Sequence, residues 1–259
     1  MANNTNMLSE EVKTAYDDFY TNSDTEWRML GAKYKAQNII DVCQSLQPKK
    51  VLEVGAGDGS ILYYLNEWNF GEELYALEIA QSGVDLIKNR NLGRLKDAQT
   101  FDGYQIPYPD DSFDLIILAH VLEHVEHERI LIRELKRVAK HIVIEVPKDY
   151  RFGVDHRMKH FLDYGHINMY TPTSLRFLLK SEGLEVIADK VSMTQPEVNY
   201  FNEFVNKKSD KSLVKKLRIA LEYYVKNSLG KILGKKKQEQ FANAYTVLTK
   251  KSDQNLHIF

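Results

Sequence analysis

The stretch Lys50–Leu62, with the sequence KVLEVGAGDGSIL, decides the fold of this 259-residue chain. It begins with a short apolar run at 51–54, continues through glycines at positions 55, 57 and 59, and ends in apolar residues at helical spacing. That order predicts a strand, a tight turn and a helix. Glycine lets a ligand approach the backbone closely, and the N–H groups at the start of a helix favour a negatively charged or strongly polar group. We therefore predict a cofactor site at this turn.

The residues around the glycines indicate the type of cofactor. The dinucleotide fingerprint G-x-G-x-x-G needs a third glycine where this chain has Ser60. Glu53 is unfavourable beside a pyrophosphate, but its carboxylate can accept hydrogen bonds from an ammonium group. The string from Glu53 to Gly59 resembles motif I of the class I S-adenosylmethionine (SAM) methyltransferases. The resemblance implies a site that binds SAM, releases S-adenosylhomocysteine (SAH), and includes Glu53, Gly55, Ala56, Gly57 and Gly59.

A second apolar segment, Glu73–Ile79, is predicted to be the next buried strand. It ends with Glu78, 19 residues beyond Gly59, where a carboxylate can accept hydrogen bonds from both ribose hydroxyls. That feature suits SAM and NAD equally. We include Glu78 and Ile79 among the expected cofactor contacts.

The segment that starts at Asp102 separates the two cofactors better. A Pro-aromatic-Pro string and a Phe-Asp pair follow Asp102 and lead into an apolar strand at 115–119. This order resembles the methyltransferase segment that contacts adenine. The resemblance implies that Asp102 accepts the adenine amino group and that the Gly103 N–H makes a second adenine contact. It also implies that His120 and Val121 lie beside the methionine part of SAM.

Strand and helix patterns alternate along the whole chain, with strands expected at 51–54, 73–79, 98–101, 115–119, 141–147, 184–191 and 241–249 and helices at 81–90, 128–140 and 175–181. This alternation predicts an α/β protein with a doubly wound, mostly parallel sheet. The resemblance implies the Rossmann-like class I methyltransferase fold, with seven strands and an antiparallel last strand. We expect four parts, which are an N-terminal helical cap (1–47), a SAM-binding core (48–196), a basic helical insertion (197–239) and the last strand with the C-terminal tail (240–259).

The loop that precedes Tyr170 carries an unusual density of His, Arg, Lys and Tyr side chains. Because it follows the carboxyl end of the fifth predicted strand, the fold would place it over the methyl-donor site. His156 and His166 are candidate general bases, since His is neutral near pH 7 and can take a proton from a hydroxyl or an amine. Binding of a substrate phosphate or carboxylate is equally favoured. The substrate candidates are Arg157, His160 and Tyr164 with Tyr20 of the cap.

Two other interpretations of this loop stay open. His156 and His160 are one helical turn apart and, with His166 and Asp155, could hold a divalent metal. The resembled family mostly works without a metal, and we expect none. Alternatively, the loop is solvated, with Tyr164 and Tyr170 packed beneath it. The string from Gly165 to Pro172 resembles one that precedes a helix in related methyltransferases, which implies that some of His166 and Asn168 is scaffold.

His120 is a candidate site residue, whereas solvation or a structural role is expected for the charged residues near it. His120 follows a strand's carboxyl end, where ligands of open α/β sheets bind, and is a further candidate for catalysis. Glu123, His124 and His127 are expected to be solvated at the start of a charged helix. Asp114 is expected to hold a turn.

The N-terminal segment 11–47 is predicted to form two helical stretches around a turn at 21–24. In the resembled family such a cap closes over cofactor and substrate, which makes Trp27, Arg28 and Lys33 candidate lid contacts in addition to Tyr20. Packing of the cap aromatics on the sheet is the favoured interpretation.

Residues 207–237 form a basic amphipathic stretch, with eleven Lys and Arg against two acidic residues and a net charge of +9. Its apolar residues recur at helical spacing. We favour capping of the active site or a homodimer contact, and peripheral membrane contact is the second interpretation. Nucleic acid is the least favoured partner, because no recognised binding module accompanies the charge.

The composition, 43% hydrophobic and 27% charged, is that of an ordinary soluble globular protein. No apolar run approaches the roughly 18 residues of a membrane span, and the first residues lack a signal pattern, so a cytoplasmic protein is expected. Cys43, the single cysteine, lies in an apolar helical pattern and is expected to be a core thiol.

Together these features predict a SAM-dependent methyltransferase. The expected acceptor is an oxygen or nitrogen of a small molecule or a glycan precursor, with an acidic or phosphorylated substrate as one form of the hypothesis. The alternatives are a non-catalytic subunit that uses the SAM fold as a binding scaffold, and an NAD-dependent oxidoreductase.

Overall fold

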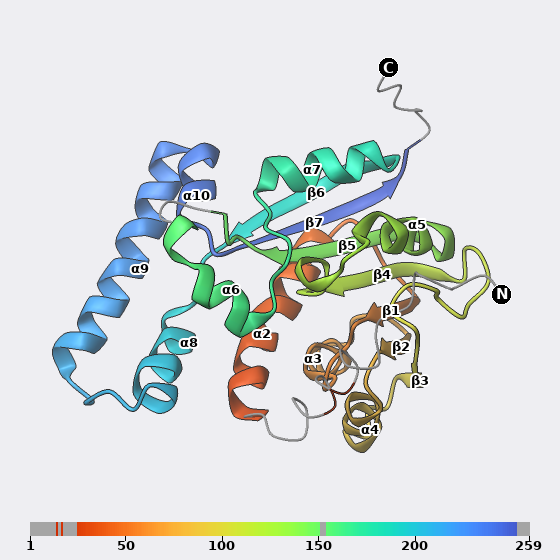
Figure 1. Cartoon of the computed structure of the whole chain (residues 1–259), viewed down its shortest axis with the longest axis horizontal. Coiled ribbons are helices and arrows are strands. Elements are labelled where there is room, and N and C mark those ends of the chain that lie inside the picture. The colour runs from red at the N-terminus through yellow and green to blue at the C-terminus, as the bar shows by residue number, and fades with distance from the viewer. Residues whose placement is uncertain (1–13, 15–16, 18–24, 151–153, 253–259) are drawn as a thin grey trace.

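The computed structural model describes residues 14, 17, 25–150 and 154–252 (Figure 1). Its strands form one sheet in the order β3-β2-β1-β4-β5-β7-β6. The strands are β1 (Lys50–Val54), β2 (Glu73–Glu78), β3 (Leu95–Thr100), β4 (Phe113–Ala119), β5 (Ala139–Pro147), β6 (Leu184–Ser192) and β7 (Ala244–Lys251). Strands β1 to β5 pair in parallel, and β7 runs antiparallel to both β5 and β6. The predicted doubly wound, seven-stranded sheet with an antiparallel last strand is confirmed.

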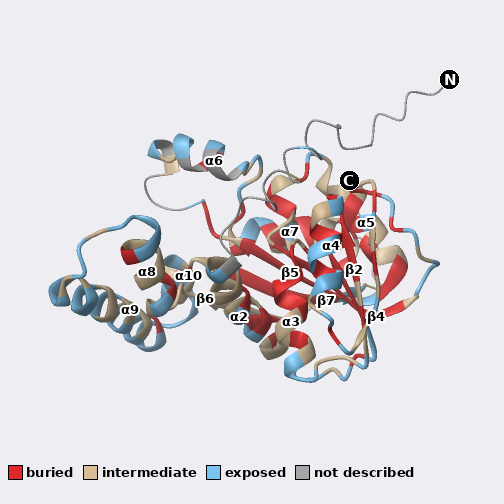
Figure 2. Ribbon diagram, turned by 90° about the horizontal axis from the view of Figure 1, so that it is seen from below, coloured by how far each residue is buried: buried red, intermediate tan, exposed pale blue. Residues whose placement is uncertain are grey.

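Helices cover both faces of this sheet. They are α2 (Thr25–Val42), α3 (Ser60–Glu67), α4 (Gln81–Asn89), α5 (Glu128–Val138), α6 (Met158–Tyr164), α7 (Pro172–Ser181), α8 (Pro196–Phe201), α9 (Leu213–Leu233) and α10 (Lys235–Phe241), with short turns η1 (Leu122–His124), η2 (Val154–His156) and η3 (Asn202–Asn206). One apolar core joins α2, α3 and α4 to the sheet, and a second joins α5 and α7 to its other face (Figure 2). Central strands are therefore apolar on both sides, which is why their sequences are continuous apolar runs rather than alternating ones.

Several element boundaries differ from the sequence-based prediction, and neighbouring elements explain three of these differences. Strand β5 begins at Ala139, inside the helix expected to reach residue 140, because Ala139 pairs with Phe113 of β4. Strand β3 begins at Leu95, ahead of the expected start at 98, because Leu95 already pairs with Leu74. The last strand covers 244–251 instead of 241–249, because α10 occupies the residues up to 241.

The glycine turn between β1 and α3 has the backbone that the sequence predicts. Gly55 and Gly59 have φ angles of +69° and +75°, in the left-handed region that favours glycine. A Cβ at Gly55 would lie under 3.0 Å from a methyl group of Val121, and one at Gly59 would lie 2.9 Å from Ile87. The turn thus depends on glycine for its conformation and for its close packing against the end of β4 and against α4.

Helix α2 packs its apolar residues into the core on one face of the sheet. Its buried residues are Ala32, Ala36, Ile39 and Val42, and Cys43 follows at its end. Burial raises the pKa of the Cys43 thiol to about 12, as expected of a core cysteine. Of the predicted cap before residue 25, the structure describes only residues 14 and 17, so Tyr20 lies outside the described residues.

The segment between β6 and β7 holds α8, α9 and α10, which lie together beyond the carboxyl end of β6 (Figure 1). Helix α9 contacts α8 and α10, and α8 contacts α2. Within residues 25–150 and 154–252, no helix is both long and apolar enough to cross a membrane.

Candidate active site

The carboxyl ends of β1, β2, β4 and β5 bring together the residues of the candidate site. At the end of β2, the buried Glu78 accepts hydrogen bonds from the N–H groups of Gly57 (2.7 Å) and Ile79 (2.9 Å). Burial raises the pKa of Glu78, although these backbone donors act against the shift. Glu78 therefore ties the glycine turn to the neighbouring strand, where a ribose could reach its carboxylate.

Glu53 lies on β1 beneath the glycine turn and is 2% exposed. Its Oε2 atom is buried without a hydrogen-bond partner. Burial, followed by the nearby Asp58 carboxylate, raises its pKa well above the ordinary value. A buried carboxylate oxygen that lacks a donor is costly, and an ammonium group of a ligand would satisfy it.

Sequence reasoning missed the ion pair that holds the far side of the turn. Arg90, which follows α4, lies 3.0 Å from a carboxylate oxygen of Asp58 and donates from Nε to the Asp58 carbonyl at 2.6 Å. Arg28 of α2 lies 3.9 Å from the same carboxylate, so this candidate lid residue lies beside the turn. The acid and the two arginines lie more than 25 positions apart in the sequence, and no local pattern links them.

The expected adenine segment forms a tight turn. Asp102 Oδ1 accepts hydrogen bonds from the N–H groups of Tyr104 (2.9 Å) and Gln105 (2.6 Å). Gly103 has a φ angle of +95°. One oxygen of Asp102 therefore holds its own turn beyond β3.

His120 lies at the end of β4, between two buried carboxylates and in the left-handed conformation (φ +57°). Its Nε2 is 3.2 Å from Glu145 of β5, and its Nδ1 is 3.4 Å from Glu123 of η1. Burial and the Lys35 ammonium oppose the charged form, but the two carboxylates outweigh them and raise the pKa of His120. Val121 follows and packs against Gly55.

Glu145 of β5 is a buried acid of the site with three hydrogen-bond contacts. It is 1% exposed and accepts hydrogen bonds from Asn38 of α2 (3.1 Å) and Thr246 of β7 (2.5 Å) in addition to its contact with His120. Burial acts to raise its pKa, but His120 and Thr246 outweigh burial and lower it. His120 is therefore held against an ionised, fixed carboxylate.

Lys35 of α2 is a site residue that sequence reasoning missed. The pKa of this half-buried ammonium is lowered by burial, although the carboxylates of Glu145, Glu123, Glu53 and Asp58 oppose the shift. The sequence signal that could have identified Lys35 was its position on the apolar face of the helix, beside Ala32 and Ala36. Lys33, one of the candidate lid contacts, lies 3.7 Å from Glu197 with its side chain 46% exposed.

The expectation that Glu123 is solvated is wrong, because this residue is 1% exposed. Helix α5 begins only at Glu128, and the residues directly after β4 form the short turn η1 instead. This turn directs Glu123 inward, and the N–H groups of Ile167 and Asn168 donate to its backbone carbonyl (2.9 and 3.0 Å). Neither oxygen of its side chain has a hydrogen-bond partner.

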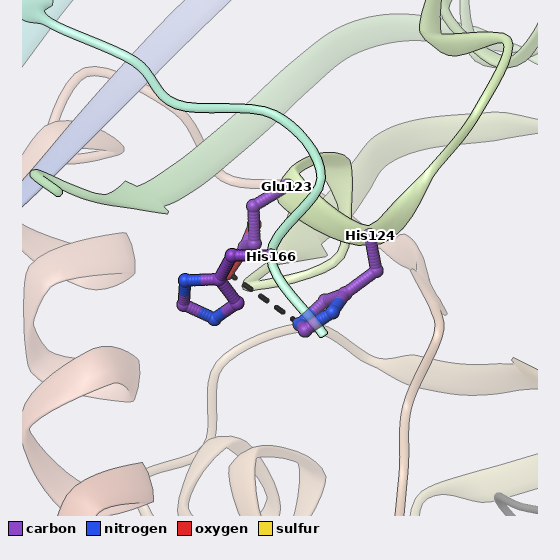
Figure 3. Close-up of side chains that lie close together, drawn as sticks. All are labelled: Glu123, His124 and His166. Atoms are coloured by element: carbon purple, nitrogen blue, oxygen red, sulfur yellow. Dashed lines mark ion pairs between the residues drawn. The ribbon is translucent and has the colours of Figure 1, made fainter. Parts of the chain in front are cut away.

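His124 and His166 lie beside Glu123, with their ring centroids 4.8 Å apart (Figure 3). His124 Nδ1 lies 3.0 Å from the carbonyl oxygen of Gly165, and His166 Nδ1 lies 2.5 Å from Asp149. Burial lowers the pKa of His124, which favours the neutral imidazole. His124 thus belongs to the site and not to a solvated helix start.

The other residues expected from the loop after β5 are dispersed. His156 is exposed on η2, outside the group formed by Glu123, His124 and His166. Arg157 lies 3.2 Å from Asp149 and stacks over Phe161 at 5.5 Å. The side chains of His160 and Tyr164, like that of Asp155, lie outside the described residues.

Comparisons with known proteins concern the family and the fold of the chain. A family model described as a methyltransferase domain matches residues 31–189. A demethylmenaquinone methyltransferase from Thermotoga maritima is 24% identical over 191 residues, covering 63% of this chain and 78% of that protein. Two solved structures share the fold. One is a chain of the complex between the Haloferax volcanii Trm112 methyltransferase activator and a putative methyltransferase (TM-score 0.61, 12% identity, 92% of this chain and 97% of that one). The other is the magnesium protoporphyrin IX methyltransferase of Synechocystis PCC 6803 with bound SAH (TM-score 0.58, 14% identity, 93% and 100%).

Proposed function

The chain belongs to the methyltransferase-domain family and is a SAM-dependent methyltransferase, and on this premise we propose that it methylates a hydroxyl oxygen of a small molecule beside His120. SAM carries an already activated methyl group, so the protein has to align the acceptor with it and to remove the acceptor's proton. A neutral amine attacks with its own lone pair, whereas a hydroxyl needs a base near pH 7. The position of His120 between two carboxylates is the observation that carries this proposal.

We assign the cofactor to the glycine turn. The partnerless Oε2 of Glu53 suits the ammonium group of the methionine part of SAM. We expect Glu78 to bind the ribose hydroxyls. We expect Asp102 to accept the adenine amino group. Positive φ angles at Gly55 and Gly59 give this turn its conformation.

His120 would act as the general base through Nδ1. A proton on Nε2 directed at Glu145 fixes the tautomer whose lone pair is on Nδ1. When Nδ1 takes the acceptor's proton, the Glu123 carboxylate at 3.4 Å stabilises the imidazolium. The relative from T. maritima is named for a quinone, which supports a small-molecule acceptor.

A thermal-shift titration with SAM, SAH and NAD tests the cofactor site. An adenosyl ligand at 100 times its dissociation constant should stabilise the protein by about 2.7 kcal/mol, whereas NAD should have no effect. Methyl transfer is then measured by mass spectrometry with a panel of hydroxyl-bearing acceptors. We expect His120→Gln to lower turnover by about 10²–10⁴-fold while SAH still stabilises the variant. His141→Gln, on β5 beyond the site, is the matched control. Unchanged turnover in His120→Gln would contradict the assigned base.

A second proposal concerns the outer face of α9. Nine large apolar residues of this helix are between 40% and 78% exposed, and we call them the α9 surface: Leu213, Val214, Leu217, Leu221, Tyr224, Val225, Leu229, Ile232 and Leu233. The segment 207–237 around them has a net charge of +9. An exposed apolar stripe on a basic helix is typical of helices that lie in a membrane interface.

We propose that the α9 surface rests on an anionic membrane, which would bring the site to an apolar acceptor. In co-sedimentation, the protein should bind vesicles of phosphatidylcholine with phosphatidylglycerol and not vesicles of phosphatidylcholine alone. The double substitution Leu217→Glu with Leu221→Glu should abolish this binding. Phe177→Glu, which changes an exposed apolar residue of α7, should not. Concentration-dependent dimers that the double substitution disrupts, without vesicle binding, would assign the surface to a second copy instead.

A further inference from the structure

We propose that Glu123, His124 and His166 form a binding site for a divalent transition-metal ion beside His120. The three side chains come from η1 and from the loop that precedes α7, and they converge on one point (Figure 3). The sequence-based expectation was that no metal binds. The proposed set shares only His166 with the metal alternative considered there.

The spacing of the three side chains is close to that of a metal site. One ligand atom from each residue lies within 4.8 Å of the other two, and His124 Nε2 is 3.9 Å from Glu123 Oε1. Metal–ligand bonds of about 2.0–2.1 Å place tetrahedral ligand atoms about 3.4 Å apart. A contraction of up to about 1.4 Å, within reach of side-chain rotation, would close the site around an ion.

Glu123 gives the second, independent observation. Its side chain is 1% exposed, and both carboxylate oxygens lack a hydrogen-bond partner. A buried carboxylate with neither oxygen satisfied is costly, and proteins usually pair such groups or place them on metals. Glu123 Oε1 lies 3.4 Å from His120 Nδ1 and 3.9 Å from His124 Nε2, and an ion bound beside it would provide the missing contacts.

Both histidines have the supporting contacts that metal-ligating imidazoles usually have. His124 Nδ1 faces the Gly165 carbonyl oxygen and His166 Nδ1 faces the Asp149 carboxylate. Protons on these nitrogens leave the ligand lone pair of each ring on Nε2. Asp149 is held in turn by Arg157 at 3.2 Å.

Backbone hydrogen bonds hold the two halves of the site together. Ile167 and Asn168 donate to the carbonyl of Glu123, and the Asn168 side chain donates to the carbonyl of Val125 at 2.7 Å. The loop carrying His166 is therefore fastened to η1 by contacts independent of any ion. Such a preorganised position is what a metal site requires.

The chemistry of the ligands selects the class of ion. Two imidazoles and one carboxylate suit Zn²⁺, Mn²⁺, Co²⁺ or Fe²⁺ better than Mg²⁺ or Ca²⁺, which prefer oxygen ligands. Three protein ligands leave a position open for an oxygen of the acceptor. This part rests on the proposed function. An ion there would make the acceptor hydroxyl more acidic, its proton would pass to His120, and the oxygen would form the new bond to the methyl carbon as the carbon–sulfur bond breaks.

Titration of the chelator-treated full chain with Co²⁺, followed by visible absorption, tests the site directly. We expect saturation at one equivalent, with an intensity typical of four- or five-coordinate Co²⁺, and displacement by Zn²⁺. Glu123→Gln and His124→Ala should weaken the binding at least about tenfold. His156→Ala is the matched control, because it removes an exposed histidine of the alternative set and should bind Co²⁺ as the wild type does.

Stabilisation by SAH, measured without metal, shows that each variant is folded and tests the cofactor site separately. His166→Gln replaces either variant if that variant does not fold. Absence of saturable Co²⁺ binding in the wild type overturns the metal site, as does equal affinity in the ligand variants. Loss of affinity in His156→Ala would favour the alternative set. None of these results affects the cofactor assignment.

Discussion

Replacing Gly55 by alanine tests how the glycine turn is held against the end of β4. The φ angle of +69° would cost an alanine about 1–2 kcal/mol. Its Cβ would also overlap a methyl group of Val121, and overpacking of this kind costs about 1–3 kcal/mol. We therefore expect Gly55→Ala to lower the free energy of unfolding by about 2–5 kcal/mol.

The second substitution Val121→Ala separates the two contributions. It removes the methyl groups that the new Cβ would meet, at a cost of about 1 kcal/mol for this half-buried side chain. In the double variant the clash disappears and the backbone strain stays. The combined destabilisation should therefore be about 1–3 kcal/mol smaller than the sum of the single effects.

Urea unfolding of the four proteins in this cycle gives the coupling free energy. Gly93→Ala is the matched control, because a Cβ there has no neighbour within 4 Å, and it should change the stability by less than about 0.5 kcal/mol. Additive effects in the cycle would refute the steric argument. A Gly55→Ala protein as stable as the wild type would refute the strain argument as well.

Two further substitutions test buried acids. Glu53→Gln should weaken SAH binding by about 10–100-fold in calorimetry, because a charge-assisted hydrogen bond is lost. It should leave the free energy of unfolding equal or higher, since burial already disfavours the carboxylate. Glu182 is buried and pairs with Arg129 (2.5 Å) and Arg133 (2.7 Å), which outweigh burial and lower its pKa. Because the pKa of Glu182 is lower in the folded state, the stabilisation from these ion pairs is present above the unfolded-state pKa of about 4.3. It is lost as the pH falls through the folded-state pKa. Glu182→Gln should therefore cost about 1–2 kcal/mol at pH 7 in urea unfolding, a modest figure because both arginines are partly exposed, and the difference from wild type should vanish in acid.

Each of these results has a contrary outcome. Unchanged SAH affinity in Glu53→Gln would remove this carboxylate from the cofactor site. If the loss of unfolding free energy in Glu182→Gln persists at acid pH, it comes from packing of the side chain and not from its charge. Glu185→Gln, which changes an exposed residue of β6, is the control for the second measurement.

The sequence was sufficient for the elements formed by local patterns. The turn in the 50–62 stretch can be recognised from its glycines, because glycine adopts positive φ angles without the cost that other residues have. The two-sided burial of β1, β4 and β5 shows as continuous apolar runs, which predict the parallel sheet. Strand boundaries were less certain, because pairing with neighbours decided that 139 and 140 belong to β5 and not to α5.

The candidate site was only partly accessible from the sequence. Glu53, Glu78, Asp102 and His120 follow or end strands, and parallel strands bring their carboxyl ends to one edge, so their proximity could be predicted. The inward turn of η1, the support of His166 by Asp149 and the approach of Lys35 across α2 depend on packing between segments distant in the chain. Burial of Glu123 is decided by the loop at 165–168, more than forty residues away. Local patterns carry no information on such contacts, and only the tertiary structure decided that these charged groups face one another and not the solvent.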